Sequence, residues 1–149
     1  MTGVEALRAA GGGLVKGIEH VAIAVPVIDD ALKFWQGQLG WRLVHVERVE
    51  EQGADTARLE LGPHCIELVA PTAPDSALGK FLTKRGPGLH HVCLETSDLG
   101  ALLGKLAASG VELIDKSPKN GAHGCKIAFV HPRATGGVLV ELSERPKQH

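Results

Sequence analysis

Two histidines and two glutamates stand at matching places in two similar parts of the sequence. His20 and His91 are each the third residue of a run in which apolar residues alternate with others, a pattern typical of a half-buried strand. Glu67 and Glu141 each lie between apolar residues of a later run, where an unpaired carboxylate would be costly. Two imidazoles and two carboxylates suit a divalent cation, with about two coordination positions left for a substrate that offers two oxygens. Such a metal would stabilise negative charge on those oxygens.

The two parts of the sequence read as two copies of one βαβββ module. After each histidine strand come a polar break, an apolar pattern with helical spacing that closes on Gly40 or Gly110, and further strands. We expect the strand after each glycine at 41–44 and 111–114. A strand histidine or glutamate taken singly is more often a core residue or a solvated one. Four of them at equivalent places in a duplicated module favour the metal site, because a pseudo-twofold axis would make them converge.

The modules are expected to form a single α+β domain over 16–146. Module one covers 16–71, a connector with one short helix covers 72–87, and module two covers 88–146. Residues 1–15 read as a flexible N-terminal arm, since they contain three successive glycines and early charges.

Charge and composition exclude several kinds of partner. Sixteen Lys and Arg residues against seventeen Asp and Glu give a net charge of −1, which provides no field to attract nucleic acid or an anionic membrane. The sequence has no run of about 18 apolar residues, so a membrane-spanning helix is not expected. Three scattered cysteines indicate reduced core thiols and a cytoplasmic location.

The strand predicted over 56–61 has one polar face. Thr56, Arg58 and Glu60 alternate with Ala57 and Leu59, so the first three share a side of the sheet. That face is either solvated or lines a wet concavity, and the sequence leaves both interpretations open.

A glycine-rich stretch in module two could hold an anionic group of a substrate. Its backbone N–H groups and a nearby lysine would cradle a carboxylate or phosphate, although such loops are often only turns. The predicted substrate-binding residues are Lys119, Gly121, Ala122, His123 and Gly124.

The motifs together resemble the vicinal oxygen chelate superfamily of glyoxalases, bleomycin resistance proteins and dioxygenases, and in detail its methylmalonyl-CoA epimerase family. The passages that carry the resemblance are Ile18-Glu19-His20-Val21-Ala22-Ile23-Ala24-Val25-Pro26, Glu51-Gln52-Gly53, Gly88-Leu89-His90-His91, Gly121-Ala122-His123-Gly124, His131-Pro132 and Gly136-Gly137-Val138-Leu139-Val140-Glu141-Leu142. The resemblance implies a curved mixed sheet around a metal site. It also implies a metal-dependent isomerase that interconverts (2R)- and (2S)-methylmalonyl-CoA through a metal-stabilised enolate, in the route between propionyl-CoA and succinyl-CoA.

The resemblance also implies roles for individual residues. His20, His91 and Glu141 fall on the family's metal-ligand positions, and Glu67 stands where some members have glutamine. One divalent ion per chain is implied, most readily Co²⁺, with Mn²⁺, Ni²⁺ or Zn²⁺ as alternatives. The implied partners are an acyl-CoA substrate and a second copy of the chain in a homodimer. The implied location is the cytoplasm, or the mitochondrial matrix in a eukaryote.

The proton-transfer groups are less completely defined. Thr56 stands where some members carry a catalytic glutamate, and threonine cannot act as a general base. Glu141 is one candidate acid or base, and Glu60 or Glu67 is the other.

Three other functions use the same fold. A lactoylglutathione lyase (glyoxalase I) would employ a similar metal site on a different substrate. An extradiol dioxygenase would need redox-active iron held by two histidines and one carboxylate, so a second glutamate argues against it. A non-catalytic small-molecule binding protein would not need the metal ligands.

Overall fold

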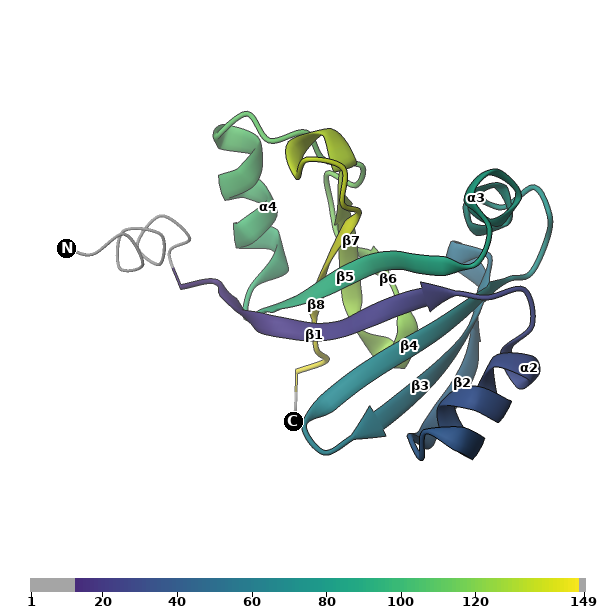
Figure 1. Ribbon diagram of the computed structural model, residues 1–149. Coiled ribbons are helices and arrows are strands. Elements are labelled where there is room, and N and C mark those ends of the chain that lie inside the picture. The colour runs from purple at the N-terminus through teal and green to yellow at the C-terminus, as the bar shows by residue number, and fades with distance from the viewer. Residues whose placement is uncertain (1–12, 148–149) are drawn as a thin grey trace. The chain divides into compact units, whose positions relative to one another are not determined.

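The computed structural model describes residues 13–147, in which the elements follow the order βαβββ twice with a helix between the two copies (Figure 1). The strands are β1 Val15–Ala24, β2 Arg42–Val49, β3 Ala54–Leu61, β4 His64–Pro71, β5 Gly88–Thr96, β6 Lys119–Asn120, β7 Lys126–Val130 and β8 Val140–Glu144. The α-helices are α2 Ile28–Leu32, α3 Ala77–Arg85 and α4 Leu99–Ala108, and a π-helical stretch, Lys33–Gln38, continues α2. This order confirms the predicted α+β duplication.

The chain forms two compact units. The first unit consists of His20–Val92 and Gly121–His123. The second unit consists of Cys93–Asn120 together with the described parts of Met1–Glu19 and Gly124–His149. Most of the predicted N-terminal arm, residues 1–12, lies outside the described residues, and Val15 is already the first residue of β1.

Both modules use the same strand order. In the first unit the order is β2-β3-β4-β1, with β1 parallel to β4 and the other neighbours antiparallel. In the second module the order is β6-β7-β8-β5, with β6–β7 and β7–β8 antiparallel; residues 88–92 of β5 belong to the first unit and residues 93–96 to the second. Each copy of the module therefore places its first strand beside its fourth, which is the arrangement expected of a duplication.

The first unit has one apolar and one polar face. Ala57, Leu59 and Leu68 are completely buried, and they pack with Trp35 and Trp41 beneath α2 and its π-helical continuation (Figure 1). Burying one such leucine contributes about 1.5–3 kcal/mol. Because side chains alternate along a strand, the neighbours of Ala57 and Leu59 in β3 point to the opposite side.

A helix from the connector packs on the first unit. The Ser76 side chain caps α3 by accepting a hydrogen bond of 3.0 Å from the N–H of Gly79, as the sequence predicts for this stretch. Leu78 is buried with Ala24 and Val69, so α3 is fixed against the ends of β1 and β4.

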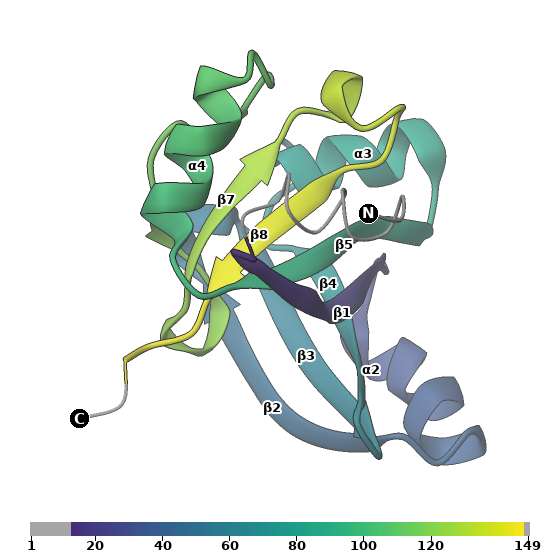
Figure 2. The same cartoon turned by 90° about the vertical axis from the view of Figure 1, so that its left-hand side faces the viewer.

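The core of the second unit lies between α4 and its strands (Figure 2). Leu99, Leu102 and Leu103 of the helix pack on Ala128 and Leu142. The Asp98 side chain caps α4 by accepting a hydrogen bond of 3.0 Å from the N–H of Ala101. The Glu144 carboxylate accepts a second one, of 2.8 Å, from the N–H of Leu99.

The prediction of a strand at 111–114 is wrong. Only Leu113 forms an isolated antiparallel bridge there, to Val130, and the module's second strand is the short β6 further along the chain. The carboxylate of Asp115 accepts the N–H of Phe129 at 2.8 Å. A side chain therefore takes a backbone donor that a neighbouring strand would use, so pairing with β7 is interrupted between Asp115 and β6.

Among residues 13–147, no helix has the length and apolar character needed to cross a membrane.

Two glycine-to-alanine substitutions test the packing of the helices. A Cβ on Gly79 would lie 2.5 Å from the carbonyl oxygen of Pro74 and 2.6 Å from that of Ala73, both of them backbone atoms. We expect Gly79→Ala to lower the free energy of unfolding by about 1–3 kcal/mol, measured by urea denaturation. The matched control is Gly104→Ala on the exposed side of α4, where a Cβ meets no atom within 4 Å. It should raise stability by about 0.5–1 kcal/mol, and equal effects of the two substitutions would contradict this packing.

Candidate metal and proton-transfer site

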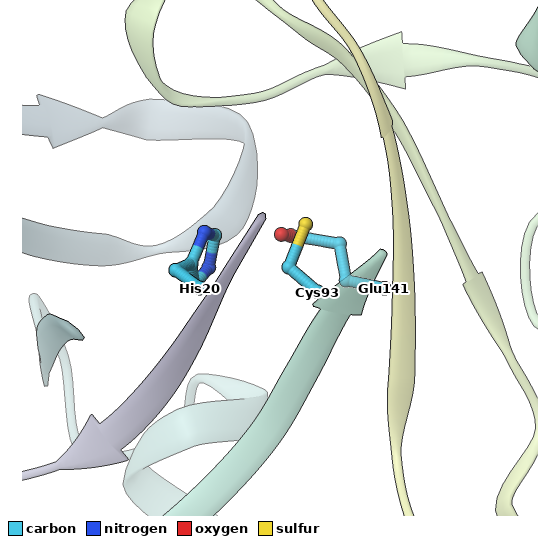
Figure 3. A group of neighbouring side chains, drawn as sticks. All are labelled: His20, Cys93 and Glu141. Atoms are coloured by element: carbon cyan, nitrogen blue, oxygen red, sulfur yellow. The ribbon is translucent and has the colours of Figure 1, made fainter. Parts of the chain in front are cut away.

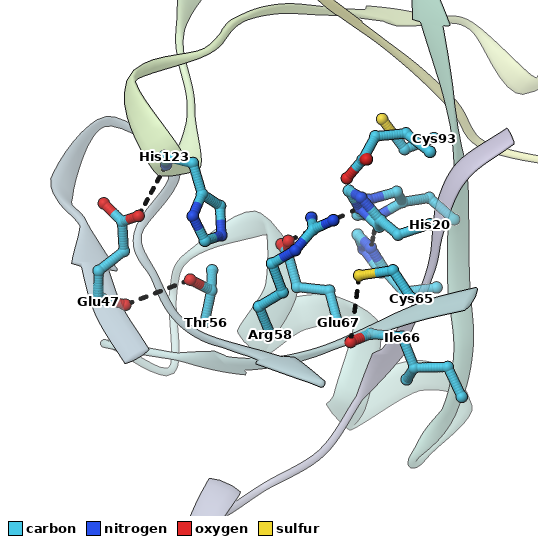
Figure 4. A network of polar contacts seen from close by, with 12 residues as sticks. His20, Glu47, Thr56, Arg58, Cys65, Ile66, Glu67, Cys93 and His123 are labelled. Atoms are coloured by element: carbon cyan, nitrogen blue, oxygen red, sulfur yellow. Dashed lines mark hydrogen bonds and ion pairs between the residues drawn. The ribbon is translucent and has the colours of Figure 1, made fainter. Parts of the chain in front are cut away.

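Three of the four predicted metal ligands lie together in the first unit. His20 on β1, Glu67 on β4 and His91 on β5 are 6%, 6% and 7% exposed. Ala22 is the register partner of Glu67, so His20, two residues away on β1, shares a face with that glutamate. His20 Nε2 lies 3.8 Å from Glu67 Oε2 (Figure 4). The rings of His20 and His91 are 5.5 Å apart between centroids.

A neighbouring histidine orients His91. The Nδ1 atoms of His90 and His91 are 2.8 Å apart, so one of them donates and the other accepts. The His90 ring in turn packs edge-on against Phe81, with 4.8 Å between centroids. Since Nδ1 of His91 is used in this way, a metal ion would bind through its Nε2 atom. In the sequence, the only indication of this supporting role is that His90 directly precedes His91.

The donor set in the first unit fits a divalent transition metal. Two neutral imidazoles and a carboxylate are the ligands that Zn²⁺, Co²⁺, Ni²⁺ and Mn²⁺ accept. All three side chains are almost fully buried, and buried charged groups are usually paired or bound to metals. The contacts between these side chains come from three strands that the sheet holds in register, so the site is built on rigid elements.

Glu141 and Cys93 lie in the second unit. Glu141 on β8 is 8% exposed, and a carboxylate oxygen lies within 4.8 Å of the sulfur of Cys93, which is completely buried on β5 (Figure 3). From its apolar strand setting, Cys93 is expected only as a core residue. Its position two residues after His91 is the one feature of the sequence that places it on the same face of the strand as that histidine, because alternate residues of a strand share a face.

The three cysteines carry thiol groups and are not joined in disulfides. Burial raises the pKa of the Cys125 thiol, and a hydrogen bond to Ser143 opposes this effect only in part. A neutral thiol is a weak nucleophile and a weak metal ligand.

The polar face of β3 is covered. Thr56 is 5% exposed and the side chain of Arg58 is 17% exposed, so the solvated interpretation of this face is wrong for these two residues. Arg58 is the register partner of Glu67, which places both on one side of the sheet (Figure 4). Glu60 lies 3.6 Å from both Arg42 and Arg58, near the hairpin that joins β3 to β4.

A second polar group in the first unit contains one predicted residue and two that the sequence analysis missed. Glu47 Oε1 lies 3.0 Å from His45 Nε2 and accepts the backbone N–H of His123 at 2.7 Å (Figure 4). The rings of His45 and His123 lie 4.5 Å apart between centroids. Only the period-two spacing of His45 and Glu47 could have indicated that they share a face.

The predicted substrate-binding residues are divided between the units. Gly121, Ala122 and His123 belong to the first unit, whereas Lys119 and Gly124 belong to the second. Lys119 Nζ lies 3.1 Å from Asp115 Oδ1 and 5.2 Å from the ring centre of Phe129, so its charge is already compensated locally.

Comparison with known proteins assigns the family. A family model described as the Glyoxalase/Bleomycin resistance protein/Dioxygenase superfamily matches residues 19–129. The chain belongs to this superfamily. The Bacillus subtilis protein named uncharacterized protein YqjC is 44% identical over 85% of this chain and 91% of its own length.

Solved structures of this superfamily are also similar. A crystal structure of methylmalonyl-CoA epimerase from Mycobacterium tuberculosis has 39% identity and a TM-score of 0.86, covering 90% of this chain and 91% of its own. A methylmalonyl-CoA epimerase in complex with methylmalonyl-CoA and NH4⁺ has 35% identity and a TM-score of 0.84, covering 89% and 95%. The superfamily and the fold predicted from the motifs are thereby confirmed.

Metal binding can be measured directly on purified protein. We expect about one Co²⁺ per chain by elemental analysis after loading and desalting, and less than a tenth of that in His91→Ala, because one of four predicted ligands is lost. His64→Ala is the control, since His64 is an exposed residue of the same unit. Equal metal content in the two variants would contradict the assignment of His91.

Proposed function

We propose that this protein interconverts the (2R) and (2S) forms of methylmalonyl-CoA. The observation that carries the proposal is the 39% identity with the Mycobacterium tuberculosis epimerase over 90% of the chain. The complex of a relative with methylmalonyl-CoA supports the same substrate class. The buried imidazoles and carboxylate of the first unit provide ligands that such chemistry can use.

We further propose that one divalent ion, Co²⁺ in preference to Mn²⁺, Ni²⁺ or Zn²⁺, is held by His20, Glu67 and His91. Glu141 is proposed as the fourth ligand because it is the counterpart of Glu67 in the repeat. When bound, the metal supplies Lewis-acid stabilisation of the negative charge that develops on the substrate oxygens.

The chain itself must move protons. The α-carbon of methylmalonyl-CoA lies between a thioester and a carboxylate, so inversion requires one group to remove its proton and another to deliver a proton to the opposite face. Glu141 is proposed for one of these roles, and Glu60 or Glu67 are the carboxylates that the sequence suggests for the other.

Glu67 also favours a second candidate function. Glyoxalase I enzymes commonly carry glutamate at this ligand position, so a lactoylglutathione lyase is the alternative. Turnover of the hemithioacetal of methylglyoxal and glutathione, with no activity on methylmalonyl-CoA, would support that alternative.

Two further expectations accompany the proposal. A homodimer and a cytoplasmic location are both implied by the resemblance and stay predictions. Sedimentation velocity of the purified protein would test whether it is a homodimer.

Exchange of the α-proton tests the proposed function. Methylmalonyl-CoA incubated with the metal-loaded protein in deuterated water should lose its α-proton NMR signal, and a chelator should slow that loss at least a hundredfold. Buffer with metal but no protein is the control. Failure of the metal-loaded protein to accelerate exchange above that control would exclude epimerase activity.

A further inference from the structure

We propose that His123 is a catalytic acid–base residue of this site, supplying the proton-transfer group on one face of the substrate. The inference rests on the proposed epimerase function. It gives His123 a role in the chemistry, beyond the substrate contact predicted from the sequence.

The backbone of His123 is held in an unusual conformation. Its φ is +59°, and it is the one non-glycine residue with positive φ in the range 13–147. Such a conformation is uncommon for a residue with a side chain and is often found at functional sites. Gly124 next to it also has positive φ, +70°, so the turn is tight on that side.

Glu47 holds this turn on the first unit. Its carboxylate accepts the His123 N–H at 2.7 Å, a charge-assisted bond that links β2 to a residue 76 positions later in the chain. The same oxygen lies 3.0 Å from His45 Nε2, and the His45 ring packs beside that of His123. Glu47 therefore fixes the backbone of His123, and the His45 ring packs against its imidazole, so the position of the side chain is restricted from two sides, as a proton-transfer residue requires.

The strand register places this group close to the proposed metal ligands. Glu47 pairs with Thr56, and Arg58, two residues further on β3, pairs with Glu67. Rows of side chains two residues apart on one face are separated by about 7 Å. The carboxylate that holds His123 thus stands one row away from the row of Glu67. Figure 4 shows the His123 ring over Thr56, on the same side of the sheet as Arg58, Glu67 and His20.

The other titratable groups on this face are less suitable. Glu60 lies two residues after Arg58 on β3, on the side away from Thr56. Its carboxylate is 3.6 Å from the guanidinium groups of both Arg42 and Arg58. Glu67 Oε2 lies 3.8 Å from His20 Nε2, among the buried candidate ligands and one row of side chains away from Glu47. Thr56, the buried residue beneath the His123 ring in Figure 4, has no basic group. An imidazole, by contrast, changes charge near neutral pH and serves as both base and acid.

The step balances as a simple proton transfer. A neutral His123 ring nitrogen takes the α-proton, so the C–H bond breaks, an N–H bond forms, and the electron pair of the C–H bond moves into the thioester carbonyl. A protonated carboxyl group on the opposite face then gives its proton to the α-carbon. The imidazolium loses its proton to water and the carboxylate regains one. The other enantiomer reacts in the reverse direction.

The test compares the two enantiomers separately in deuterated water. His123→Asn is the main variant, because asparagine tolerates positive φ and is not a base. Epimerisation should fall about 10²–10⁴-fold. For the enantiomer whose α-proton faces residue 123, exchange of that proton should fall by the same factor as epimerisation. For the other enantiomer, exchange should continue without inversion, because the acid–base group on the opposite face of the substrate is still present. Metal content should be unchanged. If the asparagine variant does not fold, His123→Gly is used in the same assay.

Matched controls separate chemistry from positioning. His64→Gln, at an exposed position of the same unit, should retain epimerisation within about threefold. Glu47→Gln should also stay close to normal, because its amide oxygen can still accept the His123 N–H, whereas Glu47→Ala should lose activity. This difference would show that Glu47 acts as a positioning residue.

Other results would overturn the proposal. Normal exchange of both enantiomers in a folded His123→Asn variant would exclude His123 as a base. Equal loss for both enantiomers would indicate a role in binding or structure instead. Absence of exchange with the unaltered, metal-loaded protein would overturn the proposed function and this inference together.

Discussion

The structure of the first unit is governed by the burial of two imidazoles and a carboxylate on one face of its sheet. The opposite face of that sheet is packed with leucine and tryptophan. His20, Glu67 and His91 are each less than a tenth exposed. Polar groups in such surroundings are stable only when their charges and hydrogen-bonding atoms are satisfied. A cation bound by all three, as proposed, would satisfy them at once, and the opposite apolar face keeps the strands in the register that brings the three together. Stability and chemistry are thus coupled in the same strands.

Supporting contacts surround the candidate ligands. His90 bonds to His91 through Nδ1 and rests on Phe81 of α3, so the connector helix helps to orient His91. Glu47 performs a comparable task for the turn at His123, which it ties to β2. In both cases a neighbouring residue restricts the movement of a candidate site residue, which keeps the local geometry fixed.

The two modules share their strand order but differ in detail. In the first, β2 pairs with β3 from Arg42 to Val49. In the second, the Asp115 side chain takes a donor of β7, and the corresponding strand is reduced to two residues. The first module has an extended strand at this place, which supplies His45 and Glu47. Divergence of the two copies has therefore given one of them a polar group that the other lacks.

The sequence by itself determined the duplication, the approximate bounds of most elements and the metal-ligand candidates, because period-two and helical patterns are local and recur in both copies. It also determined the superfamily, through motifs spread over nearly the whole chain. It could not determine that the Thr56 face is covered, since an alternating strand looks the same whether its polar side meets water or other side chains. Nor could it bring His45 and Glu47 to His123, because a contact over 76 residues depends on strand register and on a turn conformation. Only the tertiary structure decides such contacts: side chains distant in sequence become neighbours when backbone hydrogen bonds set the rows of the sheet.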